Sequence, residues 1–230
     1  SGAVHSFSQP TKQIQSAQSI PQGSGKILST ATTSNGDVLL LSDKPTVLQF
    51  DTAAGNIANV EVGTGGSWEK GNAIDTVQQN AFILDPEQGQ IWRHTRTLSS
   101  FNKGEPYLSD AQDLKNAVDL VTGNQVYVLR STGSVDQYAG GRKQSFELKK
   151  PPAPAESLEG AKAVGLHFGN NNIYVVDPLN KRVVEFTAAG DYARQFRNDE
   201  FAHAEDVVVD DKTNTLFILA GNKVYSVGLG

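Results

Sequence analysis

The amino-acid sequence predicts an all-β protein, specifically a β-propeller built from four-stranded blades. Three observations carry this prediction. A short apolar strand motif occurs five times, at steps of 42, 45, 47 and 43 residues. A second strand motif follows each copy after a short turn. No segment shows the sustained apolar period of an amphipathic helix. Strand-built repeats of about 40–50 residues are typical of propellers.

The second and third strands of each blade form the clearest repeated hairpin. The second strands are expected at Val38–Asp43, Ala81–Asp85, Val126–Arg130, Ile173–Asp177 and Leu216–Ala220. The third strands are expected at Val47–Phe50, Ile91–His94, Val135–Tyr138, Val183–Phe186 and Val224–Val227. Turn residues such as Pro, Asn and Gly separate the two strands, which predicts hairpins.

The first strand of each blade is short and apolar, and the fourth is more polar. First strands are expected at Ile27–Ala31, Ala73–Val77, Ala117–Val121, Ala163–His167 and Ala204–Val209. Fourth strands are expected at Ile57–Val62, Lys143–Leu148 and Tyr192–Phe196. This gradient from apolar to alternating polarity suits a blade whose first strand is its most enclosed.

The repeats predict a single domain over residues 1–230, with blades at about 26–71, 72–116, 117–160, 161–204 and 205–230. The last repeat ends after its third strand, so we expect residues 1–25 to supply a closing strand, from Val4–Phe7 or Lys12–Ala17. Five blades are favoured; six is the alternative if residues 1–25 form most of another blade. The chain has no Met and opens on Ser1 and Gly2, so we expect a tag remnant on an excised piece.

Composition limits the classes of partner. The formal net charge is −5, which argues against nucleic acid, because phosphate binding needs a concentrated basic surface. No apolar run is long enough to span a membrane, so an anchor would lie elsewhere in a full-length protein. Cysteine is absent, which excludes a disulfide scaffold and a thiolate metal site.

Two segments, Ile173–Phe186 and Gly190–Phe196, resemble NHL-type propeller repeats. The stretches Ile83–Trp92, Asn116–Asp119 and Gly141–Phe146 are similar to propeller domains that follow a membrane span in bacterial proteins with a serine/threonine phosphatase-like domain. The resemblance implies an extracytoplasmic sensor or interaction module, at the cell surface or in the periplasm. A cytoplasmic location stays open as the alternative.

Four aromatic residues are the candidates for a binding site: Trp68, Trp92, Phe101 and Tyr107. Trp68 has no counterpart in the repeat, and loop aromatics are common in recognition surfaces. We therefore expect a protein, small-molecule or glycan ligand at one propeller face. The loops expected to carry it are Gly63–Gly71 and Leu98–Asp113.

Three aspartates follow an alanine by two residues in their first strands: Asp75, Asp119 and Asp206. Carboxylates converging on a propeller axis could bind Ca²⁺. The favoured reading is that each caps backbone N–H groups where one blade meets the next. The four histidines lack metal-ligand spacing, and His94 takes a repeat position that Phe50, Tyr138 and Phe186 fill elsewhere.

No catalytic motif is present: the sequence has no nucleophile elbow, phosphate loop or zinc-protease motif. The expected function is therefore a non-catalytic binding or sensor module without a cofactor, part of a larger membrane-anchored bacterial protein. The alternative is a propeller hydrolase or lyase that acts on carbohydrate or a lactone with a central divalent cation.

Overall fold

The fold is a β-propeller with five blades and almost no helix. The computed structural model describes residues 2–8, 13–60, 68–98 and 100–230. It comprises two compact units, Ser1–Tyr107 (unit 1) and Leu108–Gly230 (unit 2). None of the helices in the described part of the chain has the length and apolar character that a membrane crossing requires.

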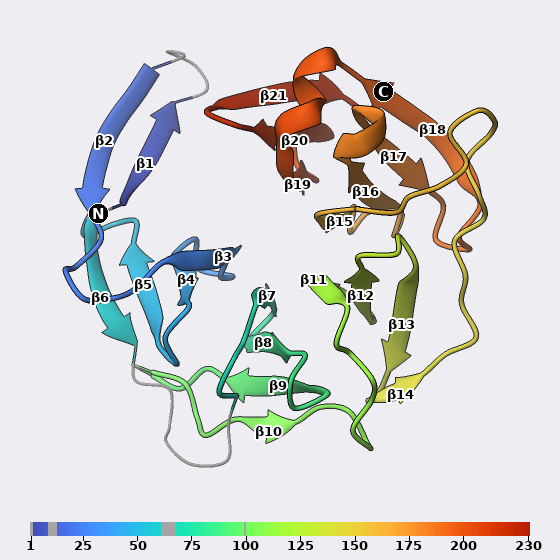
Figure 1. Cartoon of the computed structure of the whole chain (residues 1–230). Helices are drawn as coiled ribbons and strands as arrows, with labels where there is room; N and C mark the ends of the chain where they lie inside the picture. The colour runs from blue at the N-terminus through green and yellow to red at the C-terminus, as the bar shows by residue number, and fades with distance from the viewer. Residues whose placement is uncertain (1, 9–12, 61–67, 99) are drawn as a thin grey trace. The chain divides into compact units, whose positions relative to one another are not determined.

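Unit 1 contains two blades and an N-terminal pair of strands, and Figure 1 shows the strands of each blade side by side. Blade 1 comprises β3 (Ile27–Thr32), β4 (Val38–Ser42), β5 (Val47–Asp51) and β6 (Asn56–Val60). Blade 2 comprises β7 (Ala73–Val77), β8 (Asn80–Asp85), β9 (Gln90–Thr95) and β10 (Glu105–Pro106). Neighbouring strands are antiparallel throughout, as the repeated hairpins predict.

Unit 2 contains three blades. Blade 3 comprises β11 (Ala117–Thr122), β12 (Val126–Arg130), β13 (Val135–Ala139) and β14 (Arg142–Lys143). Blade 4 comprises β15 (Val164–Leu166), β16 (Ile173–Asp177), β17 (Arg182–Phe186) and β18 (Tyr192–Arg197). Blade 5 comprises β19 (Ala204–Asp210), β20 (Thr215–Ala220) and β21 (Lys223–Gly228). Two short 3₁₀ helices, η1 (Pro178–Asn180) and η2 (Asp199–His203), lie beside blades 4 and 5.

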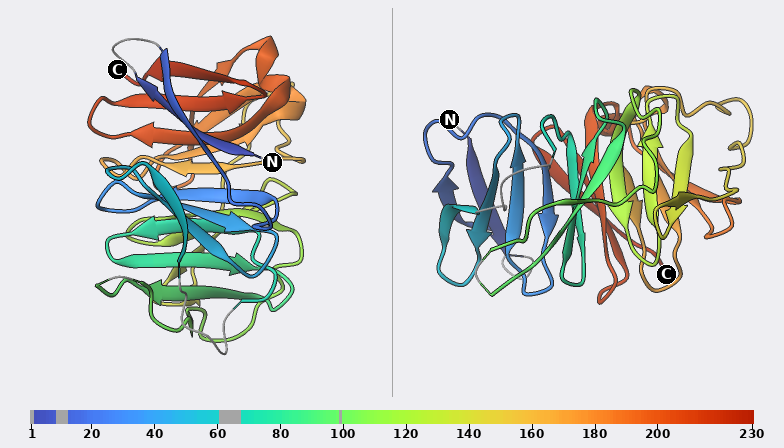
Figure 2. Two further views of the ribbon diagram at one scale, coloured as in Figure 1. Left: turned by 90° about the vertical axis from the view of Figure 1, so that its left-hand side faces the viewer. Right: turned by 90° about the horizontal axis from the view of Figure 1, so that it is seen from below.

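The N-terminal segment forms a sheet of its own. Strands β1 (Ala3–Ser8) and β2 (Gln13–Ser19) pair antiparallel with one another, and they run together in both views of Figure 2. Val4 and Ile20 pack against the blade 1 cluster that contains Leu40 and Leu48. Two strands do not make most of a blade, so the six-blade alternative is wrong. Closure of the fifth blade by an N-terminal strand stays a prediction.

The core lies between successive blades, because the middle strands are buried on both faces. Every residue of β16 is fully buried, and no residue of β17 is more than 3% exposed. In unit 2 one cluster joins blades 3 and 4, and another joins blades 4 and 5. Near-continuous aliphatic runs such as Val175–Val176 are what strands buried on both faces require.

One predicted fourth strand is wrong over most of its length. Of Lys143–Leu148, only Lys143 pairs in β14, opposite Tyr138. Beyond Gln144 the chain leaves blade 3, and Lys149 donates its backbone N–H to the Gly190 carbonyl of blade 4 at 2.8 Å. The reason is packing: Phe146 and Leu148 join the apolar cluster between these blades, where Phe146 meets the edge of Tyr127.

A buried arginine fixes the proline-rich connection that precedes blade 4. Arg182 and Asp177 are both fully buried, and Arg182 Nε donates to Asp177 Oδ2 at 2.7 Å. The Arg182 guanidinium also donates to the carbonyls of Ala155 and Ser157. A buried ion pair is tolerated when further hydrogen bonds satisfy both groups, and this one therefore holds residues 155–157 against blade 4.

Candidate functional site

Three of the four predicted binding aromatics lie in the core of unit 1. Trp68, Trp92 and Phe101 are 5%, 8% and 6% exposed. They share one apolar cluster with Leu39 and Ile83, between blades 1 and 2. Packing in the core accounts for these three aromatic residues, and none of them is exposed on a loop surface. The predicted loop Gly63–Gly71 lies largely outside the described residues.

Tyr107 keeps part of its surface exposed at the end of β10. Its ring meets Phe82 edge-on, with centroids 5.3 Å apart and planes at 89°. Its backbone N–H donates to the Ile91 carbonyl at 2.8 Å, which extends the pairing of β10 with β9. Of the four aromatics, Tyr107 alone remains on a surface that a ligand could reach.

The buried aromatics support the connection between β9 and β10, which we call the β9–β10 hairpin (residues 93–107). Phe101 is inserted into the core and bridges antiparallel to Arg96. Thr97 and Ser100 close the intervening turn through a backbone hydrogen bond of 2.8 Å. Thr95 N–H donates to Asn102 Oδ1 at 2.7 Å. The described residues on either side of the turn are therefore anchored to the core from the inner side of the hairpin.

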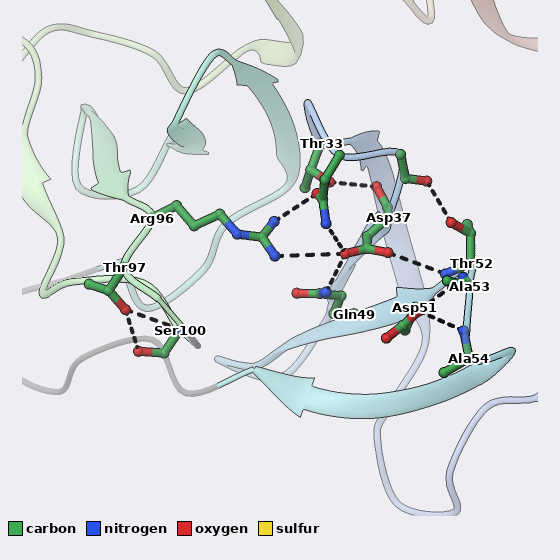
Figure 3. Close-up of polar contacts among 12 residues, drawn as sticks. Thr33, Asp37, Gln49, Asp51, Thr52, Ala53, Ala54, Arg96, Thr97 and Ser100 are labelled. Atoms are coloured by element: carbon green, nitrogen blue, oxygen red, sulfur yellow. Dashed lines mark hydrogen bonds and ion pairs between the residues drawn. The ribbon is translucent and has the colours of Figure 1, made fainter.

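Arg96 ties the base of this hairpin to blade 1. Figure 3 shows its guanidinium directed at the turn that contains Thr33 and Asp37. Arg96 Nη1 donates to Asn35 Oδ1 at 3.0 Å, and Nη2 lies 3.7 Å from Asp37 Oδ2. Asp37 is buried and also accepts from Gln49 Nε2 at 2.7 Å. This network fixes the hairpin relative to blade 1 within unit 1.

His94 lies beneath the hairpin and is 1% exposed. Its Nδ1 is 3.1 Å from the Asn102 carbonyl oxygen, so Nδ1 carries the proton and donates. A Cβ built on Gly104 would lie 2.7 Å from His94 Nε2, so only glycine allows the backbone to approach the ring this closely. Burial lowers the pKa of His94, outweighing its bond to Asn102, and the ring stays neutral.

The outer side of the hairpin carries an open cavity of about 440 Å³. The cavity is lined by Asn102, Lys103, Gly104, Glu105 and Pro106. Glu105 pairs with Arg93 across the strands at 3.2 Å. Leu98, near the tip of the same hairpin, is fully exposed. Support from the core below and an open surface above make this hairpin the candidate functional site.

The length of the connection between β9 and β10 is a further sequence signal for this site. Residues 96–104 separate β9 from β10, whereas residues 52–55, 140–141 and 187–191 suffice in blades 1, 3 and 4. An insertion at a position where the repeat is otherwise short favours a functional loop. Arg96, Asn102 and Lys103 all lie in that insertion.

The three aspartates do not share one register position. Asp119 and Asp206 oppose Leu129 and Leu219, the residues before the ends of the second strands. Asp75 instead opposes Phe82, so its counterpart in blade 3 is Val121, which opposes Tyr127. Asp119 and Val121 are two residues apart. One residue of this offset comes from a β-bulge before Asp119, present also before Asp206 and lacking in blade 2. The other arises because Ala73 opposes Leu84, whereas Ala117 opposes the strand end Arg130.

Asp119 acts as a cap between blades, as the favoured reading predicts. Its Oδ2 accepts from the Val164 N–H of the next blade at 2.8 Å, and its Oδ1 accepts from Leu120 N–H at 2.9 Å. Ser29 occupies the same register position in blade 1, and its Oγ accepts from the Ile74 N–H of blade 2 at 3.2 Å. The repeat position therefore joins first strands of successive blades.

Asp206 has a carboxyl group whose pKa is raised. It retains exposed surface, yet surrounding protein desolvates it and raises its pKa, and the charge of Glu205 adds to this. Its Oδ1 accepts from Val207 N–H at 2.7 Å. Within the described ranges, no three His, Cys, Asp or Glu side chains are grouped as a metal site would require.

Comparison with known proteins supports the fold alone. No protein-family model matches the chain, and no curated protein sequence does either. Among solved structures, the Cps50 (Swd1) β-propeller domain of Myceliophteria thermophila has a TM-score of 0.68 at 8% identity, covering 100% of this chain and 91% of that one. An auxiliary nutrient binding protein of Bacteroides thetaiotaomicron has 0.65 at 13%, covering 98% and 69%.

A third similar structure is virginiamycin B lyase from Staphylococcus aureus. Its TM-score is 0.60 at 13% identity, and the match covers 99% of this chain and 78% of the lyase. The three neighbours differ in their described roles, and each is at most 13% identical to this chain. Fold similarity at this level does not choose among those roles.

Proposed function

We propose that this chain is a non-catalytic binding module, which contacts a ligand or partner through the β9–β10 hairpin. The observation that carries the proposal is the contrast between the two sides of the hairpin. Its inner side is fixed by Phe101, His94 and Arg96, and its outer side carries the cavity and exposed Leu98. A surface that is already ordered loses less entropy on binding.

The cellular setting belongs to the same proposal. The resemblance to NHL-type repeats and to propellers of membrane-anchored bacterial proteins supports an extracytoplasmic sensor or interaction module within a longer protein. The structural similarity to a nutrient binding protein of Bacteroides thetaiotaomicron is consistent with such a role. Localisation of the full-length gene product by cell fractionation tests the setting separately from the binding surface.

The binding surface is tested by changing its outer side only. The triple variant L98S/K103S/P106A alters three exposed side chains and none of the hydrogen bonds described above. A matched control is L179S, which alters an exposed leucine in unit 2. Wild-type chain and both variants are compared on a glycan array and a bacterial protein array. We expect at least one interaction to be lost in the triple variant and kept in L179S.

Either of two results contradicts the proposal. One is that the wild-type chain binds nothing on the two arrays. The other is that every interaction survives in the triple variant with unchanged affinity. Circular dichroism melting of both variants confirms that each remains folded.

The alternative function, a hydrolase or lyase with a central divalent cation, is favoured only by the similarity to virginiamycin B lyase. The register difference at Asp75 and the backbone bonds of Asp119 give it no support. A bound ion stabilises the native state. A rise in melting temperature with millimolar Ca²⁺, lost in D206N, would favour this alternative.

A further inference from the structure

We propose that the cavity on the β9–β10 hairpin binds a small sugar acid, a ligand with one carboxylate and several hydroxyl groups. This inference deepens the proposed function and rests on it. It follows from the charges, the free hydrogen-bonding groups and the size of the cavity.

The charge of the cavity selects an anion. Glu105 is neutralised by Arg93, whose Nη2 lies 3.2 Å from Glu105 Oε2. Lys103 also lines the cavity, is exposed, and makes no ion pair with any residue that the structure describes. His94 beneath the floor is kept neutral by burial. One uncompensated positive charge therefore faces the ligand, in a chain whose net charge is −5.

The polar groups beside Lys103 suit hydroxyls. Asn102 is held by its side-chain oxygen, which accepts from Thr95 N–H at 2.7 Å, and by its carbonyl, which accepts from His94. Among the residues that the structure describes, its Nδ2 has no acceptor and is left as a donor. The Glu105 carboxylate can accept from a hydroxyl while it stays paired with Arg93, because an ionised carboxylate offers about four acceptor sites.

The remaining wall and the volume suit a sugar ring. Pro106 contributes an apolar ring without an N–H, against which the C–H face of a pyranose can pack. A volume of about 440 Å³ lies within the range of small-molecule sites, and exceeds what acetate or phosphate would fill. A bare anion would use Lys103 and leave the other groups without a partner.

The test is a titration of the full chain, ¹⁵N-labelled, followed by NMR. The probes are glucuronate, glucose and acetate, which separate the carboxylate from the hydroxyls. We expect glucuronate to shift amide signals of residues 102–105 and 107, and glucose and acetate to bind at least about tenfold more weakly. Loss of a hydrogen bond to a charged group corresponds to about tenfold or more in affinity.

Two variants and one control assign the effect to the cavity. K103Q removes the cation, and N102D keeps the oxygen that accepts from Thr95 while replacing the Nδ2 donor by a negative charge. Both should weaken glucuronate binding at least about tenfold. K115Q, at an exposed lysine in unit 2, should leave it unchanged.

The inference is overturned if glucuronate leaves residues 102–105 and 107 unshifted, if acetate or glucose binds as well as glucuronate, or if K103Q binds like K115Q. These results leave the proposed function standing when the triple variant still loses an interaction on the arrays. Failure on the arrays together with specific glucuronate binding would instead limit the hairpin to this one class of ligand.

Discussion

At the residue scale, single side chains have different roles from those that their type suggests. Trp68 and Trp92 belong to a residue type that is common in recognition surfaces, yet both are buried between the sheets of blades 1 and 2. Lys103 has no conspicuous feature in the sequence, yet it lines the cavity of unit 1. The difference arises because burial depends on which strands lie opposite a side chain, and no local pattern encodes that for a loop.

His94 allows a prediction about pH. Its folded-state pKa lies below 6.5, whereas in the unfolded chain the ring titrates near its ordinary value. Well above pH 6.5 the ring is neutral in both states. As the pH falls below that value, the unfolded chain takes up a proton that the folded state resists, so the free energy of unfolding decreases. The contribution is at most about 1.4 kcal/mol per pH unit.

The variant H94F should remove this contribution, since aromatic rings occupy the same register position in other blades, where Phe50 opposes Val38. Urea unfolding at pH 7.5 and pH 5.5 measures the difference. We expect a smaller loss of stability on acidification in H94F than in the wild-type chain. H203N, at an exposed histidine, should lose as much as wild type. Equal losses in H94F and wild type would show that folding does not disfavour protonation of His94.

At the element scale, the bulge in the first strand decides what the following residue does. Residues before Asp119 and before Ser29 are displaced from the ladder, and the next side chain reaches a backbone N–H of the neighbouring blade. Blade 2 lacks the bulge, and its first strand is also displaced by one residue, because Ala73 opposes Leu84 rather than the strand end Asp85. Asp75 therefore opposes Phe82, although its spacing from alanine is the same. A one-residue shift in a strand changes the face or the partner of every side chain after it.

This geometry predicts a loss of stability on substitution of Asp119. D119A removes the acceptor of the Val164 N–H and should lower the free energy of unfolding by about 1–3 kcal/mol. D119N retains one acceptor oxygen and should cost less. The control E205A changes an exposed bulge residue of β19 and should stay within about 0.5 kcal/mol of wild type. Chemical denaturation gives all three values, and a D119A value equal to that of E205A would refute the cap.

At the scale of the whole molecule, the number of blades follows from the repeats, and closure remains to be tested. The sheet of blade 5 has three strands among the described residues, and β1 and β2 pair with one another. We predicted that an N-terminal strand completes blade 5. An outer strand protects the backbone amides of the strand beside it from exchange.

Removal of residues 1–8 therefore tests closure. If an N-terminal strand completes the blade, deletion should speed hydrogen exchange of β21 amides by at least about tenfold, which corresponds to about 1.4 kcal/mol of local stability. V4A is the control, because it removes packing against the blade 1 cluster and leaves the backbone of β1 in place. Unchanged exchange in β21 after the deletion would rule β1 out as the closing strand.

The fold could be predicted from sequence in detail where strands are buried on both faces. The second strands Val126–Arg130 and Ile173–Asp177 have the predicted bounds, because an aliphatic run between turn residues has few alternative structures. The fourth strands were predicted less well: β10 was not predicted, and of Lys143–Leu148 only Lys143 lies in a strand. Edge strands carry few apolar positions, so their course depends on neighbouring blades.

The sequence by itself determined the class of fold, the number of blades and the absence of a recognisable catalytic motif. These follow from periodicity and residue type, which are local and repeat along the chain. Only the tertiary structure decided that Trp68, Trp92 and Phe101 are buried, that Asp75 is out of register with Asp119, and that an insertion after β9 carries a cavity. The physical reason is that burial, register and cavities depend on contacts between segments distant in sequence, which the repeat pattern does not specify.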